Sequence, residues 1–170
     1  AAETSKTGKL AMIGGPDVPS IRSTFKAFKA GAESVKPGIV VKEVFTGKDS
    51  DVAAAKQATL AAIDEGADRV IHQANAAAQG VFDACKEKGV LAFGANADQN
   101  SNASGVVLAS AVIVAKPAFV EVAKQVKEGT FKGSVVLMGL DKGAIDFVLN
   151  DALKGQVSAE VLAKVEETRK

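Results

Sequence analysis

Polar side chains that could hold a small molecule follow each of four short apolar runs in the first hundred residues. Gln73 and Asn75 lie at and just after the end of the run 69–73, and Asn96 and Asp98 follow the run 90–94. The two earlier runs are also followed by polar residues. Amides and a few charges, with no obvious nucleophile among them, suit a polar solute held by directed hydrogen bonds. The candidate ligand-binding residues are Asp17, Arg22, Asp49, Gln73, Asn75, Asn96 and Asp98.

The segment 66–99 contains the elements that must position these residues. Its pattern is strand, loop, helix, strand, loop, which is a βαβ unit. Apolar strand-like runs at 9–13, 39–45, 69–73 and 90–94 alternate with helical periodicity over 18–35, about 51–65 and 81–88. In open parallel sheets the ligand crevice lies outside the carboxyl ends of the strands. We therefore expect the polar clusters at 72–75 and 96–99 to share one rim.

The second half of the chain predicts more of the same architecture. A strand is expected at 106–110, a helix from Lys116 to about Gly129, a strand over Ser134–Met138, a short apolar run at 144–149 and a last helix capped by Ser158. Residues 1–8 carry no periodicity and are interpreted as a tail or the end of an incoming connection. The sequence thus predicts one α/β domain over 1–170, with a parallel β-sheet and helices on both faces.

Composition excludes several classes of partner. The chain has 170 residues, is 47% hydrophobic and carries a formal net charge of +1, with basic and acidic residues interspersed. No basic face or polybasic run predicts binding to nucleic acid or to anionic lipid. No apolar run reaches the roughly 18 to 20 residues that a membrane span needs, and no signal-peptide pattern opens the chain.

Catalytic signatures are scarce. Gly14-Gly15 lacks the spacing of a dinucleotide fingerprint, and Gly47-Lys48 lacks the flanking residues of a Walker loop. His72, the only histidine, falls inside an expected strand and is interpreted as a packed residue, and Cys85, the only cysteine, as a buried small hydrophobe. No catalytic residue, cofactor or metal site is expected, and the chain is not expected to be an enzyme.

Several segments, in order and spacing, resemble the basic membrane protein family. The stretch KLAMIGGPDVPSIR at 9–22 is similar to the opening of the second half of these proteins, which are substrate-binding lipoproteins of nucleoside-type ABC importers. The similarity continues through 66–73, 80–89, 98–99 and 128–133, and so covers nearly the whole chain.

This resemblance implies a type I periplasmic-binding-protein fold, of which the chain would be the second lobe. Family members are roughly twice as long, so 8–96 would form the lobe core and 97–170 the segments that return from the first lobe. The implied function is the binding of a small polar solute, nucleoside-like or related, for an ABC permease. The implied location is periplasmic or extracellular, in a lipoprotein anchored to the membrane. Apolar edges at Val106–Leu108 or Ser134–Met138 would then be free to pair with a missing N-terminal lobe or a second copy.

Carried over residue by residue, the resemblance puts the ligand class in question. It implies an acid that holds ribose hydroxyls where this chain has Asn96, an aromatic ring that stacks on the base at Asp49, and a lysine near Ile113, while Asp98 and Gln99 match the family motif.

Two other functions are open at the level of sequence. The same fold serves as the ligand-sensing effector domain of transcriptional regulators, and fold alone does not separate the two roles. A flavodoxin-like or sugar-phosphate enzyme is the other alternative, and the absence of a phosphate loop stands against it.

Overall fold

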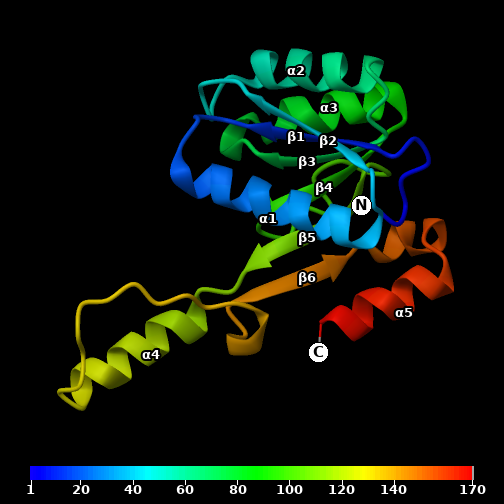
Figure 1. Ribbon diagram of the computed structural model, residues 1–170. Helices are drawn as coiled ribbons and strands as arrows, with labels where there is room; N and C mark the ends of the chain where they lie inside the picture. Colours follow the sequence, from blue (N-terminus) through cyan, green and yellow to red (C-terminus); the bar gives the residue numbers. More distant parts are fainter. Residues whose placement is uncertain (170) are drawn as a thin grey trace.

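A six-stranded sheet organises the chain, with strand order β2-β1-β3-β4-β5-β6. The computed structural model describes residues 1–169 (Figure 1). Its strands are β1 (Lys9–Gly14), β2 (Val40–Phe45), β3 (Arg69–Gln73), β4 (Leu91–Asn96), β5 (Val107–Ile113) and β6 (Ile145–Leu149). The helices are α1 (Pro19–Val35), α2 (Val52–Asp64), α3 (Ala78–Lys88), α4 (Lys116–Lys127) and α5 (Ala159–Thr168), with short 3₁₀ turns at Asn75–Ala77, Leu140–Lys142 and Asp151–Gln156.

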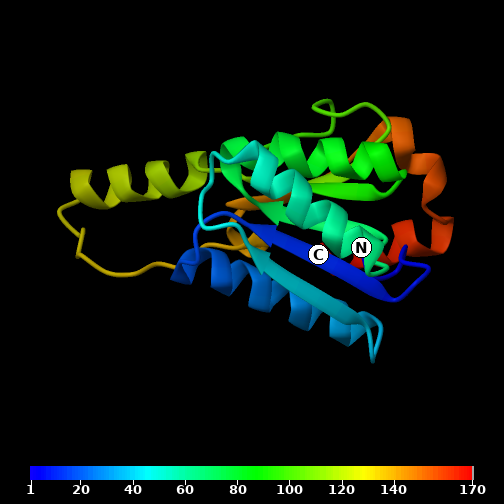
Figure 2. The ribbon, with the colours of Figure 1, turned by 90° about the horizontal axis from the view of Figure 1, so that it is seen from above.

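The α/β class expected from the sequence is confirmed, with helices on both faces of the sheet (Figures 1 and 2). Alternate residues of β1 face opposite layers, as the two-residue period of a strand requires. Ala11 and Ile13 pack with residues of α2 and α3 on one face, whereas Met12 packs with Phe25 of α1 on the other. Both sides of the central strands are therefore buried, as in other parallel sheets covered by crossover helices.

The sheet is not wholly parallel, contrary to what the sequence predicts, because its last strand, β6, runs in the opposite direction. Strands β1 to β5 pair in parallel, but β6 runs antiparallel to β5, with Ala109 opposite Leu149 and Ile113 opposite Ile145. The run at 144–149 is short and apolar like the others, and nothing in its composition indicates its direction. Because β5 is flanked by β4 and β6, Val107 and Leu108 are buried, and the expected free edge at Val106–Leu108 is wrong.

The strand expected at Ser134–Met138 is also wrong. These residues form no strand, and Val135 and Leu137 expose 93% and 89% of their surface. A β-rich run becomes a strand only when its backbone groups find a neighbouring strand, and in residues 1–169 the segment has none.

Helix α4 and the segment after it project away from the sheet (Figure 1). None of the residues of α4 is buried, and Phe119 and Val126 expose 74% and 60% of their surface. We define the projecting surface by the exposed apolar residues of α4 and the segment after it: Phe119, Val120, Val122, Val126, Phe131, Val135, Val136, Leu137 and Leu140. Soluble monomers rarely expose so much apolar surface within one region.

We expect the isolated chain to self-associate through the projecting surface as a dimer or by strand exchange. Replacing Phe119 and Val126 together by glutamate should shift it to monomer, because charge opposes burial of this face. Sedimentation velocity over a wide range of concentration measures the effect. The matched control is Val35→Glu, an exposed valine at the end of α1. A wild-type chain that stays a monodisperse monomer would refute the expectation.

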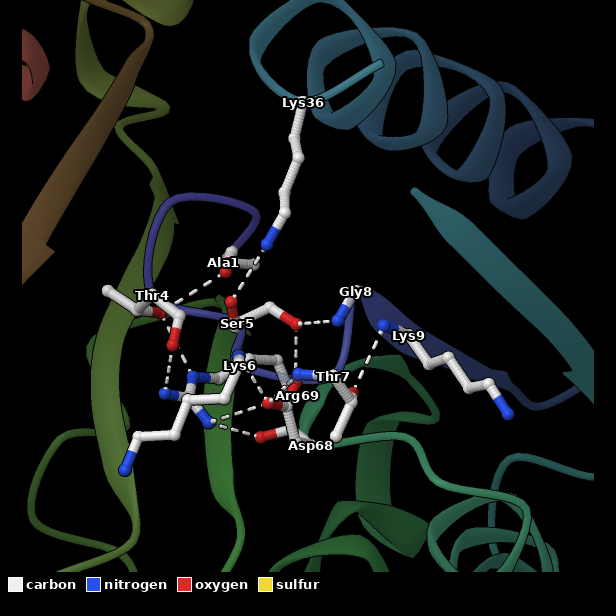
Figure 3. Close-up of polar contacts among 10 residues, drawn as sticks. All are labelled: Ala1, Thr4, Ser5, Lys6, Thr7, Gly8, Lys9, Lys36, Asp68 and Arg69. Atoms are coloured by element: carbon white, nitrogen blue, oxygen red, sulfur yellow. Dashed lines mark hydrogen bonds and ion pairs between the residues drawn. The ribbon is translucent and has the colours of Figure 1, made fainter. Parts of the chain in front are cut away.

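Residues 1–8 are held against the sheet rather than forming a loose tail (Figure 3). The Asp68 carboxylate accepts hydrogen bonds from the Ser5 hydroxyl and the Lys6 amide at 2.6 Å each and from the Thr7 amide at 3.0 Å. Arg69 donates to the Thr4 hydroxyl at 2.9 Å. Burial opposes ionisation of Asp68, but these hydrogen bonds outweigh it, and its pKa lies below the ordinary value.

Asp68→Asn is expected to lower the free energy of unfolding by about 1 to 2 kcal/mol, because a charged acceptor of three hydrogen bonds is lost. The wild type should also lose stability as pH falls below about 4, where the unfolded carboxyl takes up a proton before the folded one does. Urea denaturation at neutral and acid pH measures both effects. Asp64→Asn is the control, since Asp64 is exposed and, among residues 1–169, pairs only with Lys88. Equal losses in the two variants would contradict the role of Asp68.

Candidate functional site

A cleft of about 370 Å³ opens at the carboxyl ends of the strands. Its walls come from the loop after β1, the first turns of α1, the end of β3 with the turn that follows, and the ends of β4 and β5. The lining residues are Pro16, Val18, Ser20, Ile21, Thr24, Gln73, Asn75, Asn96 and Ile113. This is the edge at which parallel α/β sheets bind ligands.

The cleft lining contains amides, hydroxyls and apolar side chains but no ionisable group. The Asn96 side-chain nitrogen donates to the Gln73 side-chain oxygen across a long 3.4 Å separation. This leaves the Gln73 nitrogen and the Asn96 oxygen without a hydrogen-bond partner among residues 1–169. The arrangement can donate to and accept from the hydroxyl or amide groups of an uncharged molecule.

Two asparagines of the cleft have left-handed backbones. Asn75 has φ of 46° and Asn96 has φ of 68°, and no other non-glycine residue in 1–169 has a positive φ. Asparagine tolerates this conformation better than most residues, but it still stores strain. Strained backbone that the surroundings hold in place is concentrated at functional sites.

Asp49 does not line the cleft but is hydrogen-bonded to Asn75, which does. Its carboxylate accepts from the Asn75 side-chain nitrogen at 3.1 Å, and its backbone oxygen accepts from the Ala77 amide at 2.9 Å. Gly15 makes room for this contact, since a Cβ there would lie 2.9 Å from the Asp49 Cα. The loop after β2 is thereby fastened to the loops after β1 and β3.

Asp17 and Arg22 are occupied by each other. The Arg22 guanidinium makes two hydrogen bonds to the Asp17 carboxylate and stands over the Phe45 ring, 5.3 Å from its centroid. Both side chains are about half exposed and lie outside the cleft lining.

Asp98 is a turn residue. Its carboxylate accepts from the Asn100 amide at 3.0 Å, and the side chain does not line the cleft. Of the seven candidates, the structure thus brings Gln73, Asn75 and Asn96 together in one cleft. Sequence reasoning missed Ser20 and Thr24 as lining residues. Their spacing of four on the first turns of α1, beside Pro19, was the available signal.

His72 precedes the cleft residue Gln73 on β3, where it is 2% exposed and packs edge-on against Phe82. It is a packed strand residue, as expected. Burial lowers the pKa of His72, and its hydrogen bond with Gln99 acts in the opposite direction without cancelling the shift. The imidazole is therefore neutral in the folded protein at neutral pH.

Stability is expected to fall as pH drops below about 6.5, because the unfolded histidine takes up a proton there while the folded one does not. Urea denaturation between about pH 5 and pH 7 measures the slope, in a range above the titration of Asp68. A His72→Gln variant should show a shallower slope than the wild type. A part should remain, because burial lowers the pKa of the Ala1 amine to about 5 and this group also takes up a proton on unfolding in this range. An equal slope in the two chains would contradict the role of His72. A wild-type chain whose stability is flat over this range would show that His72 is not held neutral.

Other chemistry is not indicated by the described residues. Cys85 is fully buried, as expected, and burial raises the pKa of its thiol to about 12. Within residues 1–169, no cluster of histidine, cysteine and acidic side chains could hold a metal ion. None of the helices there combines the length and the apolarity that a bilayer crossing requires.

Comparison with solved structures gives the same architecture. A transcriptional activator of the comK gene from Bacillus halodurans superimposes with a TM-score of 0.82 at 21% identity, over 99% of this chain and 57% of that one. A solute-binding protein of an ABC transporter system from Aeropyrum pernix gives a TM-score of 0.75 at 21% identity, over 98% of this chain and 49% of the other. At these identities the likeness shows the fold, which is that of type I periplasmic-binding proteins.

Sequence comparison identifies the family. A purine-binding protein from Brucella abortus is 29% identical over 85% of this chain and 41% of its own length. The nucleoside-binding protein BmpA of a Lactococcus lactis ABC transporter is 29% identical over 98% of this chain and 52% of its own. The chain thus spans about half the length of these relatives. The Bmp family model, described as ABC transporter substrate-binding protein PnrA-like, matches residues 1–169, and the chain belongs to this family.

Proposed function

We propose that this chain forms one wall of the ligand cleft of a solute receptor that delivers its cargo to an ABC permease. The solute is a small, uncharged polar molecule, nucleoside-like or related. The observation that carries the proposal is the cleft itself. It lies at the carboxyl ends of β1, β3, β4 and β5 and is lined by amides, hydroxyls and apolar groups without a single charge. Family membership supports the assignment to transport.

The cleft residues have complementary roles in this proposal. Gln73, Asn75 and Asn96 supply hydrogen bonds, and Ser20 and Thr24 add hydroxyls from α1. Val18, Ile21 and Ile113 provide an apolar surface. The remaining candidates act around the cleft: Asp49 by fastening Asn75, Asp98 within its turn, and Asp17 with Arg22 as a charged pair outside the lining. A phosphorylated or zwitterionic solute would find no opposite charge here, and desolvating it would oppose binding.

The relatives are about twice as long, and we propose that a first lobe completes the receptor by closing over the cleft. Enclosure between two lobes buries most of the surface of a ligand and so supplies most of the affinity. The chain alone should then bind weakly. In the complete receptor the cleft would face the periplasm or the exterior, and the protein would be held at the membrane by a lipid anchor.

Chemical-shift mapping of the ¹⁵N-labelled chain tests this function. Inosine, adenine and D-ribose at millimolar concentration serve as probes. At least one is expected to perturb Gln73, Asn75 and Asn96, and Asn96→Ala should weaken that binding about tenfold, the effect of one lost hydrogen bond. Asn102→Ala, which removes an exposed amide outside the cleft, is the matched control. Shifts that map outside the cleft would refute the assignment, and sub-micromolar binding would refute the need for a second lobe.

The effector-domain alternative is not favoured. The fold is shared with a transcriptional activator and, at a TM-score of 0.55, with a LacI-family repressor, but both are under 25% identical to this chain. The family model that matches the chain describes ABC transporter substrate-binding proteins.

A further inference from the structure

A largely buried hydrogen-bond network holds the residues that flank Asn96 in the chain. The Gln99 side-chain oxygen lies 2.8 Å from His72 Nε2 and accepts from the Ala95 amide, also at 2.8 Å. The Ala74 amide donates to His72 Nδ1 at 3.4 Å, so Nε2 carries the proton and donates to Gln99. The Gln99 side-chain oxygen therefore links His72 of β3 to Ala95 of β4, the residue that precedes Asn96.

The same turn is anchored a second time on β5. The backbone amide of Gln99 donates to the Ser110 hydroxyl at 3.0 Å, and that hydroxyl donates to the Asn100 side-chain oxygen at 2.9 Å. The Asn100 side-chain nitrogen donates onward to the Val148 carbonyl of β6 at 3.2 Å. His72 and Ser110 are almost completely buried, so these hydrogen bonds are shielded from water.

The glycine at position 94 allows this arrangement. A Cβ there would lie 2.4 Å from the Ser110 hydroxyl oxygen and 2.9 Å from the Gln99 Cβ. Any other residue at this position would push the Gln99 side chain and the turn away from the end of β4.

Asn96 needs such support because its own contacts are weak. Its backbone is left-handed, its side chain is exposed, and its only side-chain hydrogen bond in residues 1–169 is the 3.4 Å contact with Gln73. A strained conformation persists where neighbouring groups fix it from both sides. Before Asn96, the backbone amide of Ala95 donates to the Gln99 side-chain oxygen. After Asn96, the backbone amide of Gln99 donates to the Ser110 hydroxyl.

We propose that Gln99, with its partner His72, is a positioning residue that fixes the left-handed backbone of Asn96 and so aims its side chain into the cleft beside Gln73. Neither Gln99 nor His72 contacts the solute. The inference rests on the proposed function only in taking Asn96 as a residue that contacts the solute. The effect of Gln99 on the Asn96 backbone is expected with or without a ligand.

Two substitutions at Gln99 separate its hydrogen bonds from its volume. Gln99→Met keeps the length of the side chain and removes the acceptor, whereas Gln99→Glu keeps an acceptor for both His72 and the Ala95 amide. In crystal structures of the ligand-free chain, Asn96 should leave the left-handed region in Gln99→Met and remain there in Gln99→Glu. Gln79→Met is the matched control, because Gln79 is exposed and its carboxamide donates to Asp83 as its only hydrogen bond within 1–169.

Each outcome of this experiment decides the proposal. Asn96 unchanged in Gln99→Met, or displaced in Gln99→Glu, overturns it. If Gln99→Met does not fold, Gln99→Leu, which also removes the acceptor, takes its place. Titration with inosine, adenine and D-ribose then adds the functional part: a probe that binds the wild type should bind Gln99→Met about tenfold more weakly and Gln99→Glu nearly as well. If no probe binds the wild type, the proposed function fails while the positioning result stands on the structures.

Discussion

Gly80→Ala is expected to lower the free energy of unfolding by on the order of 3 kcal/mol, since overpacking a tight helix contact forces backbone to move. A Cβ at Gly80 in α3 would lie 2.1 Å from the Val52 carbonyl oxygen and 2.9 Å from the Lys56 amide nitrogen of α2. Both neighbours are backbone atoms, so no side chain can rotate away. The two helices would have to separate across the core that they share with β1 and β3. Chemical denaturation measures the loss.

Gly31→Ala provides the matched control for this prediction. Gly31 is also a helical glycine, in α1, but nothing lies within 4 Å of a Cβ placed there. Alanine favours the helix by up to about 1 kcal/mol over glycine, so this variant should be as stable as the wild type or more so. If the two alanine variants lost stability equally, close approach of α2 and α3 would not be the reason for glycine at position 80.

The first four strands could be predicted from the sequence because local signals agreed there. Each is a short apolar run bounded by glycine, proline or polar residues, and each is followed by helical periodicity. Helix starts carried a further signal. Ser158, the expected cap of the last helix, accepts from the Val161 amide at 3.3 Å. For α2 the polar run Asp49-Ser50-Asp51 offers three possible caps, and in the structure Asp51 accepts from the Ala54 amide at 2.9 Å.

The second half of the chain was less predictable because its outcome depends on partners that sequence periodicity does not specify. Ser134–Met138 has the composition of a strand, but the described part of the chain offers it no neighbouring strand to pair with. The run at Ile145–Leu149 found one, β5, and paired in the antiparallel direction. Pairing is a tertiary property, and the β propensity of an isolated run says little about it.

The candidate site was predictable where it depends on topology and not where it depends on contacts between side chains. Gln73, Asn75 and Asn96 meet because parallel strands end at one edge of the sheet. Position in the sequence alone predicts Asp17 and Arg22 in the cleft, but these opposite charges, five residues apart, form an ion pair with each other. Gln99 was expected on the rim and instead lies below it, because the buried His72 offers it a hydrogen bond.

The identity of the solute gives the second large effect. The resemblance to basic membrane proteins implies an acid, an aromatic ring and a lysine at three positions where this chain has Asn96, Asp49 and Ile113. In the structure Asn96 and Ile113 line the cleft, and Asp49 is engaged with Asn75 outside the lining. The differences at Asn96 and Ile113 thus alter the binding surface directly. Asn96 keeps one acceptor oxygen but lacks the charge, and Asp49 and Ile113 supply neither the aromatic ring nor the lysine that the resemblance implies.

We therefore expect the complete two-lobed receptor to prefer a smaller or differently functionalised polar solute over inosine, adenosine and guanosine. Hydrogen bonds from ribose hydroxyls to a carboxylate are roughly twice as strong as those to a neutral amide such as Asn96. A lost aromatic stacking contact costs on the order of 1 kcal/mol more. Together these losses amount to about a hundredfold in affinity or more, at about 1.4 kcal/mol per tenfold. A thermal-shift screen of this chain, completed by the matching first half of the Lactococcus relative, measures the preference. Asn96→Asp should raise the response to nucleosides, because the carboxylate restores the charged acceptor. The opposite result is that a nucleoside gives the largest stabilisation with Asn96 in place and that Asn96→Ala abolishes it. The amide would then be sufficient for nucleoside binding, and the expected preference for another solute would be wrong.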